Sequence, residues 1–221
     1  MADMRTIQVT GKGKISVKPD MMRLTITLEG TCKDYGVTLK RTSDDTEKLR
    51  TLVCGSDFAG EDLKTISFNV NTEYESYEEE GVYKQRFTGY RYIHVMKLEF
   101  DSDNDRLGQL LAALSGSDLH PEFRISYTVK DREAAKNKLL ADAVRDASEK
   151  AKILAGAAGV SLKEIQKINY SWGEVDLEVR PMNLMCEHSM KISSSAGGYD
   201  LNIEPDDIEV SDTVTVVWEI A

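Results

Sequence analysis

The sequence predicts an α+β protein with a largely antiparallel sheet and about three helices packed on one face. A long amphipathic pattern at residues 131–159 is typical of a helix that covers a sheet, and about seven other segments alternate apolar and polar residues as half-buried strands do. Turns join neighbouring strand segments at least as often as helices do, which favours hairpins over parallel crossovers. No linker divides the 221 residues, so we expect a single domain, residues 1–221.

Residues 6–31 are predicted to form a hairpin, with two alternating strands joined by a turn at Lys18-Pro19-Asp20. Gly11 and Gly13 lie inside the first strand, where glycine indicates a bulge or the close approach of another backbone. Lys12 completes a Gly-Lys-Gly sequence that resembles part of a phosphate-binding loop. Because the third glycine and the following helix of such a loop are missing, we interpret the pair as structural.

A helix and a long pair of strands are expected next. Residues 34–54 show a helical stripe with steps of four and three residues: Tyr35, Leu39, Thr42, Thr46, Leu49 and Val53. Strands are predicted at 63–70 and 87–100, and the acidic segment 73–81 between them is interpreted as a solvated hairpin tip rather than a cation site. His94 alternates with buried positions of the second strand, which favours a half-buried strand residue over a ligand.

A short helix at 104–115 and a strand at 123–129 precede the long helix. The acidic residues 101–105 open like a calcium loop, but Arg106 and Ala112 stand where such a loop needs glycine and glutamate. We therefore expect this cluster to cap the short helix, whose inward face carries four leucines: Leu107, Leu110, Leu111 and Leu114.

The long helix at 131–159 is expected to begin at Asp131, whose side chain caps the first turn, and to end at Gly159 in the left-handed conformation. Small and apolar residues share one face of it: Leu140, Ala143, Val144, Ala147, Ala151, Leu154, Ala155 and Ala158. Because alanine dominates this face, we expect the helix backbone to pack tightly on a sheet.

The last part of the chain is predicted to hold a strand at 165–171, an irregular segment at 172–199 and a closing strand at 210–220. The closing strand carries few charges, and its apolar face contains Val214, Val216 and Trp218. At a sheet edge such a strand would be paired, either within the chain or by another copy. We therefore predict a homo-oligomer.

Composition excludes several functions. The formal net charge is −10 and the pI is about 4.9, so a non-specific nucleic-acid partner is not expected. No apolar run approaches the ~20 residues of a membrane span, and the N-terminal residues show no signal peptide. Cys32, Cys54 and Cys186 are odd in number and widely spaced, which favours free thiols in a reducing compartment and predicts a cytoplasmic location.

Four stretches, at residues 7–30, 88–100, 142–168 and 203–220, resemble the SIMPL-domain family, a bacterial group. The glycine pair, Pro19-Asp20 and the alanine-rich helix occur in the family's order, whereas Asp206 stands where the family usually has glycine. The resemblance spans nearly the whole chain.

The resemblance implies two interleaved α+β lobes, one of them ferredoxin-like, at about 1–80 with 200–221 and about 85–171. It implies no catalytic activity, no catalytic residues and no cofactor. Family members are associated with oxidative-stress tolerance, and some assemble into large rings. Many carry leaders and work in the periplasm or at the cell surface, which the N-terminal residues of this chain do not support.

One segment has the composition of a metal site. Thioether, thiol and imidazole groups gather within nine residues, and soft sulfur donors select copper(I): Met182, Met185, Cys186, His188 and Met190. The alternative is a loop whose methionines pack on a surface or a partner. We predict no dedicated metal site, because no framework is predicted to hold these ligands.

Two functions are therefore kept as alternatives. The first is a non-enzymatic SIMPL-type protein that acts as an oligomeric scaffold or interaction module, linked to stress tolerance through the resemblance. The second is a soft-metal or redox-responsive binding protein that uses residues 182–190. No nucleophile–base motif is visible, since His94, His120 and His188 share no spacing. An enzyme with an unrecognised site is a third, weaker alternative.

Overall fold

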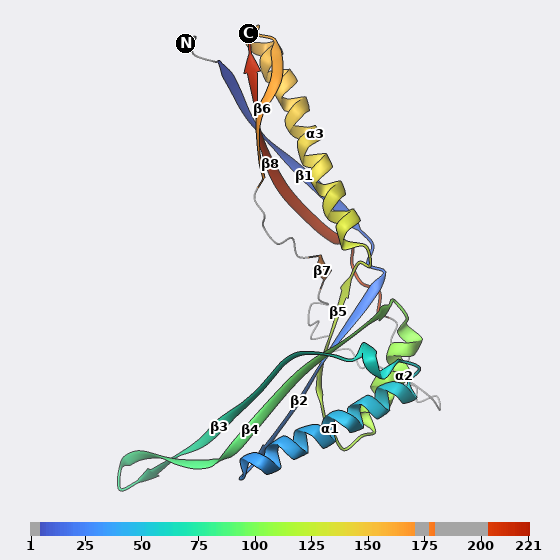
Figure 1. The fold of residues 1–221 in the computed structure, drawn as a ribbon, viewed down its shortest axis with the longest axis vertical. Coiled ribbons are helices and arrows are strands. Elements are labelled where there is room, and N and C mark those ends of the chain that lie inside the picture. The colour runs from blue at the N-terminus through green and yellow to red at the C-terminus, as the bar shows by residue number, and fades with distance from the viewer. Residues whose placement is uncertain (1–4, 171–176, 180–202) are drawn as a thin grey trace, which may run out of the picture. The chain divides into compact units, whose positions relative to one another are not determined.

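A computed structural model describes residues 5–170, 177–179 and 203–221 (Figure 1). Within these ranges the protein has three α-helices and two antiparallel sheets, one of three strands and one of five. The predicted α+β class is confirmed. The strand order is β1-β8-β6 in the smaller sheet and β3-β4-β2-β5-β7 in the larger one.

The chain forms two compact units, at residues 1–20 with 128–179 and 205–221, and at residues 21–127 with 180–204. The first unit contains the whole long helix, and the second contains the two strands on either side of the acidic segment.

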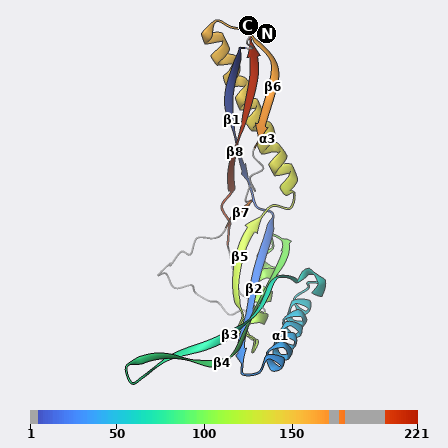
Figure 2. The same cartoon turned by 60° about the vertical axis from the view of Figure 1, so that its left-hand side comes forward.

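The first unit contains the three-stranded sheet, the helix that covers it and the short strand β7, which is the last strand of the larger sheet. Its elements are β1 (Thr6–Val17), α3 (Arg132–Ala158), β6 (Leu162–Tyr170), β7 (Glu178–Val179) and β8 (Ile208–Ile220). Asp131 caps α3 by accepting a hydrogen bond from the Ala134 amide at 2.8 Å, and Gly159 ends it with φ of 69°, both as predicted. Figure 2 shows α3 lying along β1 and β8.

The face of α3 that meets the sheet is built from alanine. Ala143, Ala147 and Ala151 are fully buried and pack against Val214 and Val216 of β8. Leu154, which the helical spacing placed on the same face, is 49% exposed. The buried stripe is therefore narrower than the sequence pattern and consists mostly of side chains of one carbon.

The predicted hairpin at residues 6–31 is wrong. β1 pairs with β8, whereas β2 (Met21–Cys32) pairs with β4. The turn residue Asp20 carries the chain from one sheet to the other: its amide donates to the Thr128 carbonyl at 3.2 Å, and its carboxylate accepts from the Lys130 amide at 2.8 Å. Both strands were recognised, but alternation alone does not say which strand is the partner.

The closing strand β8 does not lie at a sheet edge, although an edge position was the reason for expecting an oligomer. It lies between β1 and β6, so both of its edges are paired within the chain. The free edges of the smaller sheet belong to β1 and β6.

The second unit holds the remaining strands and helices. They are α1 (Tyr35–Gly55), the short 3₁₀ helix η1 (Gly60–Asp62), β3 (Lys64–Glu79), β4 (Val82–Asp101), α2 (Asn104–Ser115) and β5 (Glu122–Thr128), together with β2. The core side chains come from β2, β4 and the two helices, and include Leu24, Ile26, Leu49, Leu98 and Leu107. The inward leucines of α2 are buried as predicted, and Asp103 caps that helix.

α1 buries only part of its predicted stripe. Leu49 and Val53 are completely buried, whereas Tyr35 and Leu39 are 50% and 39% exposed. Thr38, rather than these two, is buried in the N-terminal half of the helix. The N-terminal half of α1 therefore presents threonine to the sheet and leaves apolar side chains on its flank.

Candidate functional site

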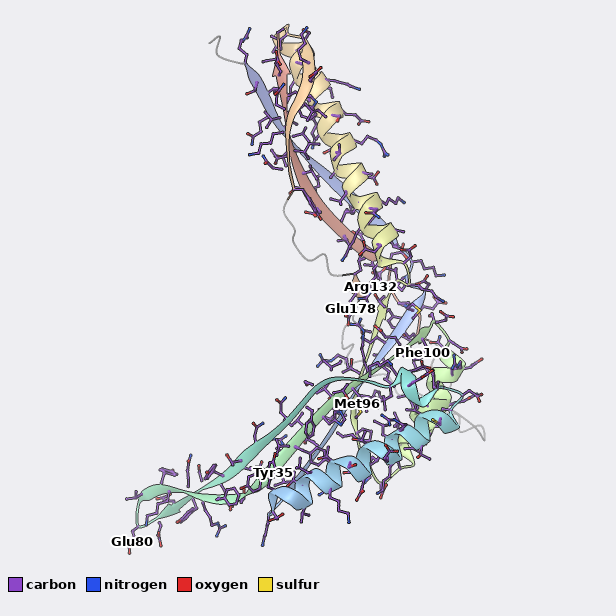
Figure 3. The ribbon with its side chains drawn as sticks, viewed as in Figure 1. Tyr35, Glu80, Met96, Phe100, Arg132 and Glu178 are labelled. Carbon is purple, nitrogen blue, oxygen red and sulfur yellow. The ribbon has the colours of Figure 1, made fainter. Side chains whose placement is uncertain are left out.

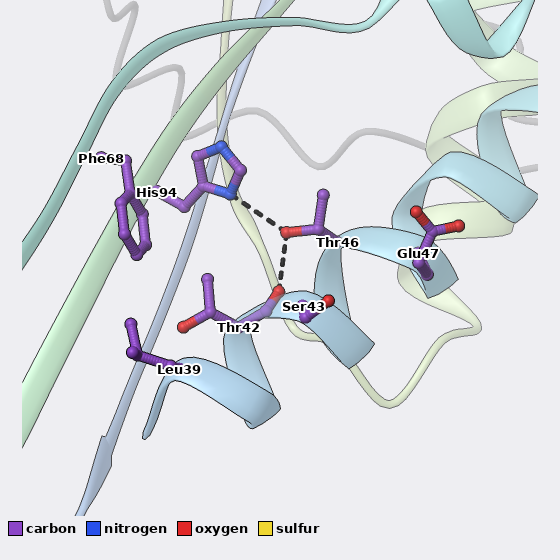
Figure 4. Close-up of a pocket in the computed structure, with 7 residues that line it drawn as sticks. All are labelled: Leu39, Thr42, Ser43, Thr46, Glu47, Phe68 and His94. Carbon is purple, nitrogen blue, oxygen red and sulfur yellow. Dashed lines mark hydrogen bonds between the residues drawn. The ribbon is translucent and has the colours of Figure 1, made fainter. Parts of the chain in front are cut away.

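A groove of about 340 Å³ lies in the second unit between α1 and the strands β3 and β4 (Figure 4). Five of the side chains around it come from successive turns of α1, one from β3 and one from β4. They are Leu39, Thr42, Ser43, Thr46, Glu47, Phe68 and His94.

His94 forms the inner part of the groove because of its place on β4. It alternates with half-buried positions of β4 and lies on the strand face that meets α1, where it is only 8% exposed. The ring of Phe68 meets the imidazole edge to face, with centroids 5.4 Å apart. The predicted half-buried strand histidine is thus confirmed, and it is more deeply buried than expected.

Hydrogen bonds to threonine fix the protonation of the imidazole. The Thr46 hydroxyl donates to the Thr42 carbonyl at 2.7 Å, so its oxygen can only accept from His94. The proton therefore sits on Nδ1, which lies 3.0 Å from Thr46 Oγ1. In the neutral ring, Nε2 then accepts from the hydroxyl of Thr65 at 2.9 Å. Both nitrogens therefore have a hydrogen-bond partner.

Burial favours the neutral form of the His94 imidazole. It lowers the pKa of His94 below its ordinary value, because the charged form loses hydration in this position. A neutral imidazole whose two nitrogens are already hydrogen-bonded is poorly placed to take a proton from a substrate. The seven groove residues therefore contain no nucleophile–base pair, and apolar side chains form part of the groove walls.

A second polar cluster lies beside the groove, where α1 meets β2 and β4. The Tyr92 hydroxyl donates to Asp45 at 2.6 Å, and Arg41 Nε stands 3.5 Å from the same carboxylate oxygen. Burial, followed by the hydrogen bond to Asp45, raises the pKa of Tyr92. The Arg41 guanidinium also lies 4.0 Å from the Cys32 sulfur. The cluster joins α1 to the sheet.

The outer part of the β3–β4 pair is a two-stranded ribbon with exposed aromatic side chains. β2 pairs with β4 only from Tyr90 onwards, so residues 73–79 and 82–89 pair with each other alone. Figure 3 shows Glu80 at the tip of this ribbon, beyond Tyr35 at the start of α1. None of the residues of β3 is buried.

Aromatic rings follow one another along this ribbon. Tyr74 and Phe87 meet edge to face at 5.8 Å, and Phe87 meets Tyr90 at 5.3 Å. Tyr90 in turn meets Tyr35 of α1 at 5.4 Å. Tyr83, nearer the tip, is 79% exposed. We call the four ring-contacting residues Tyr35, Tyr74, Phe87 and Tyr90 the aromatic row.

The residues singled out from the sequence are distributed as follows. The candidate soft-metal ligands Met182, Met185, Cys186, His188 and Met190 lie outside the described residues. In the described part of the chain, no group of three or more histidine, cysteine or acidic residues could hold a metal ion.

Gly11 and Gly13 have a structural role, as predicted. The amide of Lys12 donates to Asp146 at 2.7 Å, and both glycines lie against α3. The acidic residues 101–105 supply the cap of α2 through Asp103. The acidic segment 73–81 forms most of the outer ribbon, with its turn at Glu80 and Gly81.

The sequence can also be compared with known protein families. The family described as "SIMPL: Protein of unknown function (DUF541)" matches residues 7–218. The chain belongs to the SIMPL family. The match spans both units, so the resemblance read from the glycine pair and the alanine-rich helix is confirmed. No curated protein matches the sequence of this SIMPL protein. Among the described residues, no helix combines the length and apolar character required to cross a membrane.

Sequence reasoning missed the groove. Its one available signal is the repeat of hydroxyl residues at Thr38, Thr42 and Thr46 on the covered face of α1, where leucine or alanine is expected. Those hydroxyls bond to the preceding turn of the helix, and Thr46 also bonds to His94. Their spacing did not reveal that α1 leaves β3 partly uncovered.

Proposed function

We propose that this SIMPL protein is non-enzymatic and acts as an oligomeric scaffold or interaction module whose self-contact is the β3–β4 ribbon. The observation that carries the proposal is the aromatic row, of which Tyr74 and Phe87 lie on a two-stranded segment without a core of its own. A two-stranded hairpin is at best marginally stable in water, and large exposed apolar surfaces mark interaction sites.

The free edge of β3 offers a way for two copies to join. β3 is the terminal strand of its sheet, so one side of its backbone has unpaired amides and carbonyls. Antiparallel pairing of two β3 strands, centred on Asn71, would bring Phe68 opposite Tyr74. Aromatic pairs at facing positions stabilise such a ladder.

The net negative charge of the chain opposes unspecific association, and two ion pairs lie within the ribbon itself. Within the ribbon, Arg86 pairs with Glu75 at 2.7 Å, and Lys84 lies within salt-bridge distance of Glu79. The chain as a whole has a net charge of −10, which opposes unspecific clustering. A self-contact through β3 gives a dimer with twofold symmetry; a ring would need a second, different contact.

The proposal includes a cytoplasmic location, which the free thiols of Cys32 and Cys54 support, because disulfides are rare in reducing compartments.

Molar mass measured by light scattering after size exclusion tests the self-contact, at several protein and salt concentrations. We expect a mass above 24.7 kDa for the wild type and a lower mass for the double variant Tyr74→Ser, Phe87→Ser. The control is Ile153→Ser, which removes an equally apolar side chain that is 70% exposed on α3. A wild-type mass that stays near 24.7 kDa under all conditions would contradict the proposal, as would a double variant with the wild-type mass.

A further inference from the structure

We propose that the groove between α1 and β3 binds a small hydrophobic amine, that is, a molecule with one apolar body and one protonated amino group. The groove does not include the aromatic row, although Phe68 also lies on the β3 edge proposed for the self-contact. Ligand binding does not depend on self-association.

The dimensions of the groove limit the ligand to a small molecule. Its volume of about 340 Å³ is at the lower end of the range of roughly 300–1,000 Å³ that ligand pockets occupy. A peptide segment of several residues would extend beyond the seven residues that line it. A single ring or a short branched chain fits this volume.

Two apolar side chains provide walls for the body of the ligand. Leu39 on α1 and Phe68 on β3 are 39% and 45% exposed and line the groove above the buried residues Thr42 and His94. The edge-to-face contact with His94 holds the Phe68 ring in place. An apolar group between these walls would remove from water a surface that the protein alone leaves hydrated.

The hydrogen-bonding groups that remain free in the groove point to a donor on the ligand. Thr42 and Thr46 donate their hydroxyl protons to carbonyls one turn earlier in α1. Ser43 has no such bond in the part of the chain that the structure describes, so its oxygen remains available as an acceptor. Glu47 follows Ser43 by four residues and therefore lies on the same side of the helix. Figure 4 shows both side chains on the α1 wall.

The charge of these groups selects a cation. Glu47 is the one ionised group among the seven lining residues, because the imidazole of His94 is neutral. Its ion pair with Arg50, at 3.3 Å, joins two solvent-exposed side chains, and such a pair is weak enough for a ligand to replace it. An ammonium group near Glu47 gains an opposite charge, whereas a carboxylate there would be repelled.

Chemical-shift titration of the ¹⁵N-labelled protein tests the site with three probes of one shape. These are phenethylamine, the neutral phenethyl alcohol and the anionic 3-phenylpropionate. We expect saturable shifts of the amides around Ser43, Phe68 and His94, with the amine bound more tightly than the alcohol and the anion bound least. No saturable shift in the groove, or an anion that binds as tightly as the amine, would overturn the proposal.

Two pairs of variants at exposed positions separate the charge from the apolar walls. Glu47→Gln is expected to raise the Kd of the amine about two- to fivefold and to leave that of the alcohol unchanged. Its control is Glu61→Gln on η1, which should change neither constant. Phe68→Ser should weaken both ligands several-fold, whereas Tyr83→Ser on the ribbon should weaken neither. Equal effects of Glu47→Gln and Glu61→Gln on the amine would contradict the role of Glu47, and equal effects of the two aromatic variants would place the ligand elsewhere.

Discussion

Gly11 on β1 and Ala143 on α3 are in direct backbone contact. A β-carbon added to Gly11 would stand 2.1 Å from the carbonyl oxygen of Ala143, where β-carbon contacts below 3.0 Å are essentially never seen. At Gly13 it would stand 2.2 Å from the carbonyl oxygen of Leu139. The glycine pair and the alanine stripe are thus two sides of one adaptation, since both let the helix backbone lie on the sheet.

Gly11→Ala is predicted to destabilise the protein by about 3 kcal/mol, the upper end of the usual range for overpacking. The obstacle is backbone, which cannot rotate away as a side chain can. Urea unfolding measures the change. The control is Gly156→Ala. Gly156 lies on α3, the helix that Gly11 contacts, but it faces open space, so this variant should stabilise the protein by about 0.5–1 kcal/mol. Equal stability of Gly11→Ala and the wild type would show that α3 does not rest on β1.

Ala147→Leu tests the same packing from the side of the helix. Ala147 is completely buried between α3 and the sheet, so the larger side chain is predicted to cost about 1–3 kcal/mol. Lys150, on the polar side of α3, forms an exposed ion pair with Asp146 at 2.6 Å. Lys150→Ala should therefore change stability by no more than about 0.5 kcal/mol. Equal melting temperatures of the two variants would mean that the helix faces have been assigned wrongly.

Local structure could be predicted from the sequence because its signals are local. The cap at Asp131 and the left-handed end at Gly159 each depend on a few neighbouring residues, and both were confirmed. The close approach at Gly11 was indicated by the glycine itself, but its partner Ala143 was not. The pairing of strands was not predictable in this way. β1 and β8 are about 200 residues apart along the chain, and no turn between them signals their contact.

The candidate site was harder to predict for a related reason. The groove exists because α1 leaves the side of β3 next to it partly uncovered, and this is a property of how a helix lies on a sheet rather than of any motif. Phe68 and His94 come from neighbouring strands, and Leu39 from a helix that precedes both. Leu39 read from the sequence as a core residue, and only its exposure of 39% shows that it borders a groove.

Tyr92→Phe is predicted to destabilise the second unit by about 1.5–3 kcal/mol, the usual range for a hydrogen bond to a charged group. The hydroxyl of Tyr92 donates to Asp45 at 2.6 Å, and its loss leaves a largely buried carboxylate with one partner fewer. Tyr90→Phe is the control, because Tyr90 contacts its neighbours through its ring. Equal unfolding free energies of the two variants would contradict a stabilising role for the Tyr92–Asp45 bond.

The last prediction concerns pH and His94. Burial holds the pKa of this histidine below its ordinary value of about 6.5, whereas the unfolded chain keeps that value. Below about pH 6.5 the unfolded state therefore binds more protons at this site than the folded state does. The stability linked to His94 is fully present above that pH and is lost as the pH falls towards the lower pKa of the folded state.

We therefore expect the unfolding free energy to fall from pH 7.5 to pH 5, and to fall less in His94→Gln, whose uncharged side chain does not titrate. The measurement is urea unfolding at both pH values. His120→Asn is the control, because His120 is exposed at a φ of 44°, a conformation that asparagine tolerates, and it should keep the wild-type pH dependence. If His94→Gln keeps the full wild-type decrease, the buried imidazole is not its source. A wild type that is more stable at pH 5 would reverse the sign and mean that the folded protein holds His94 in its charged form.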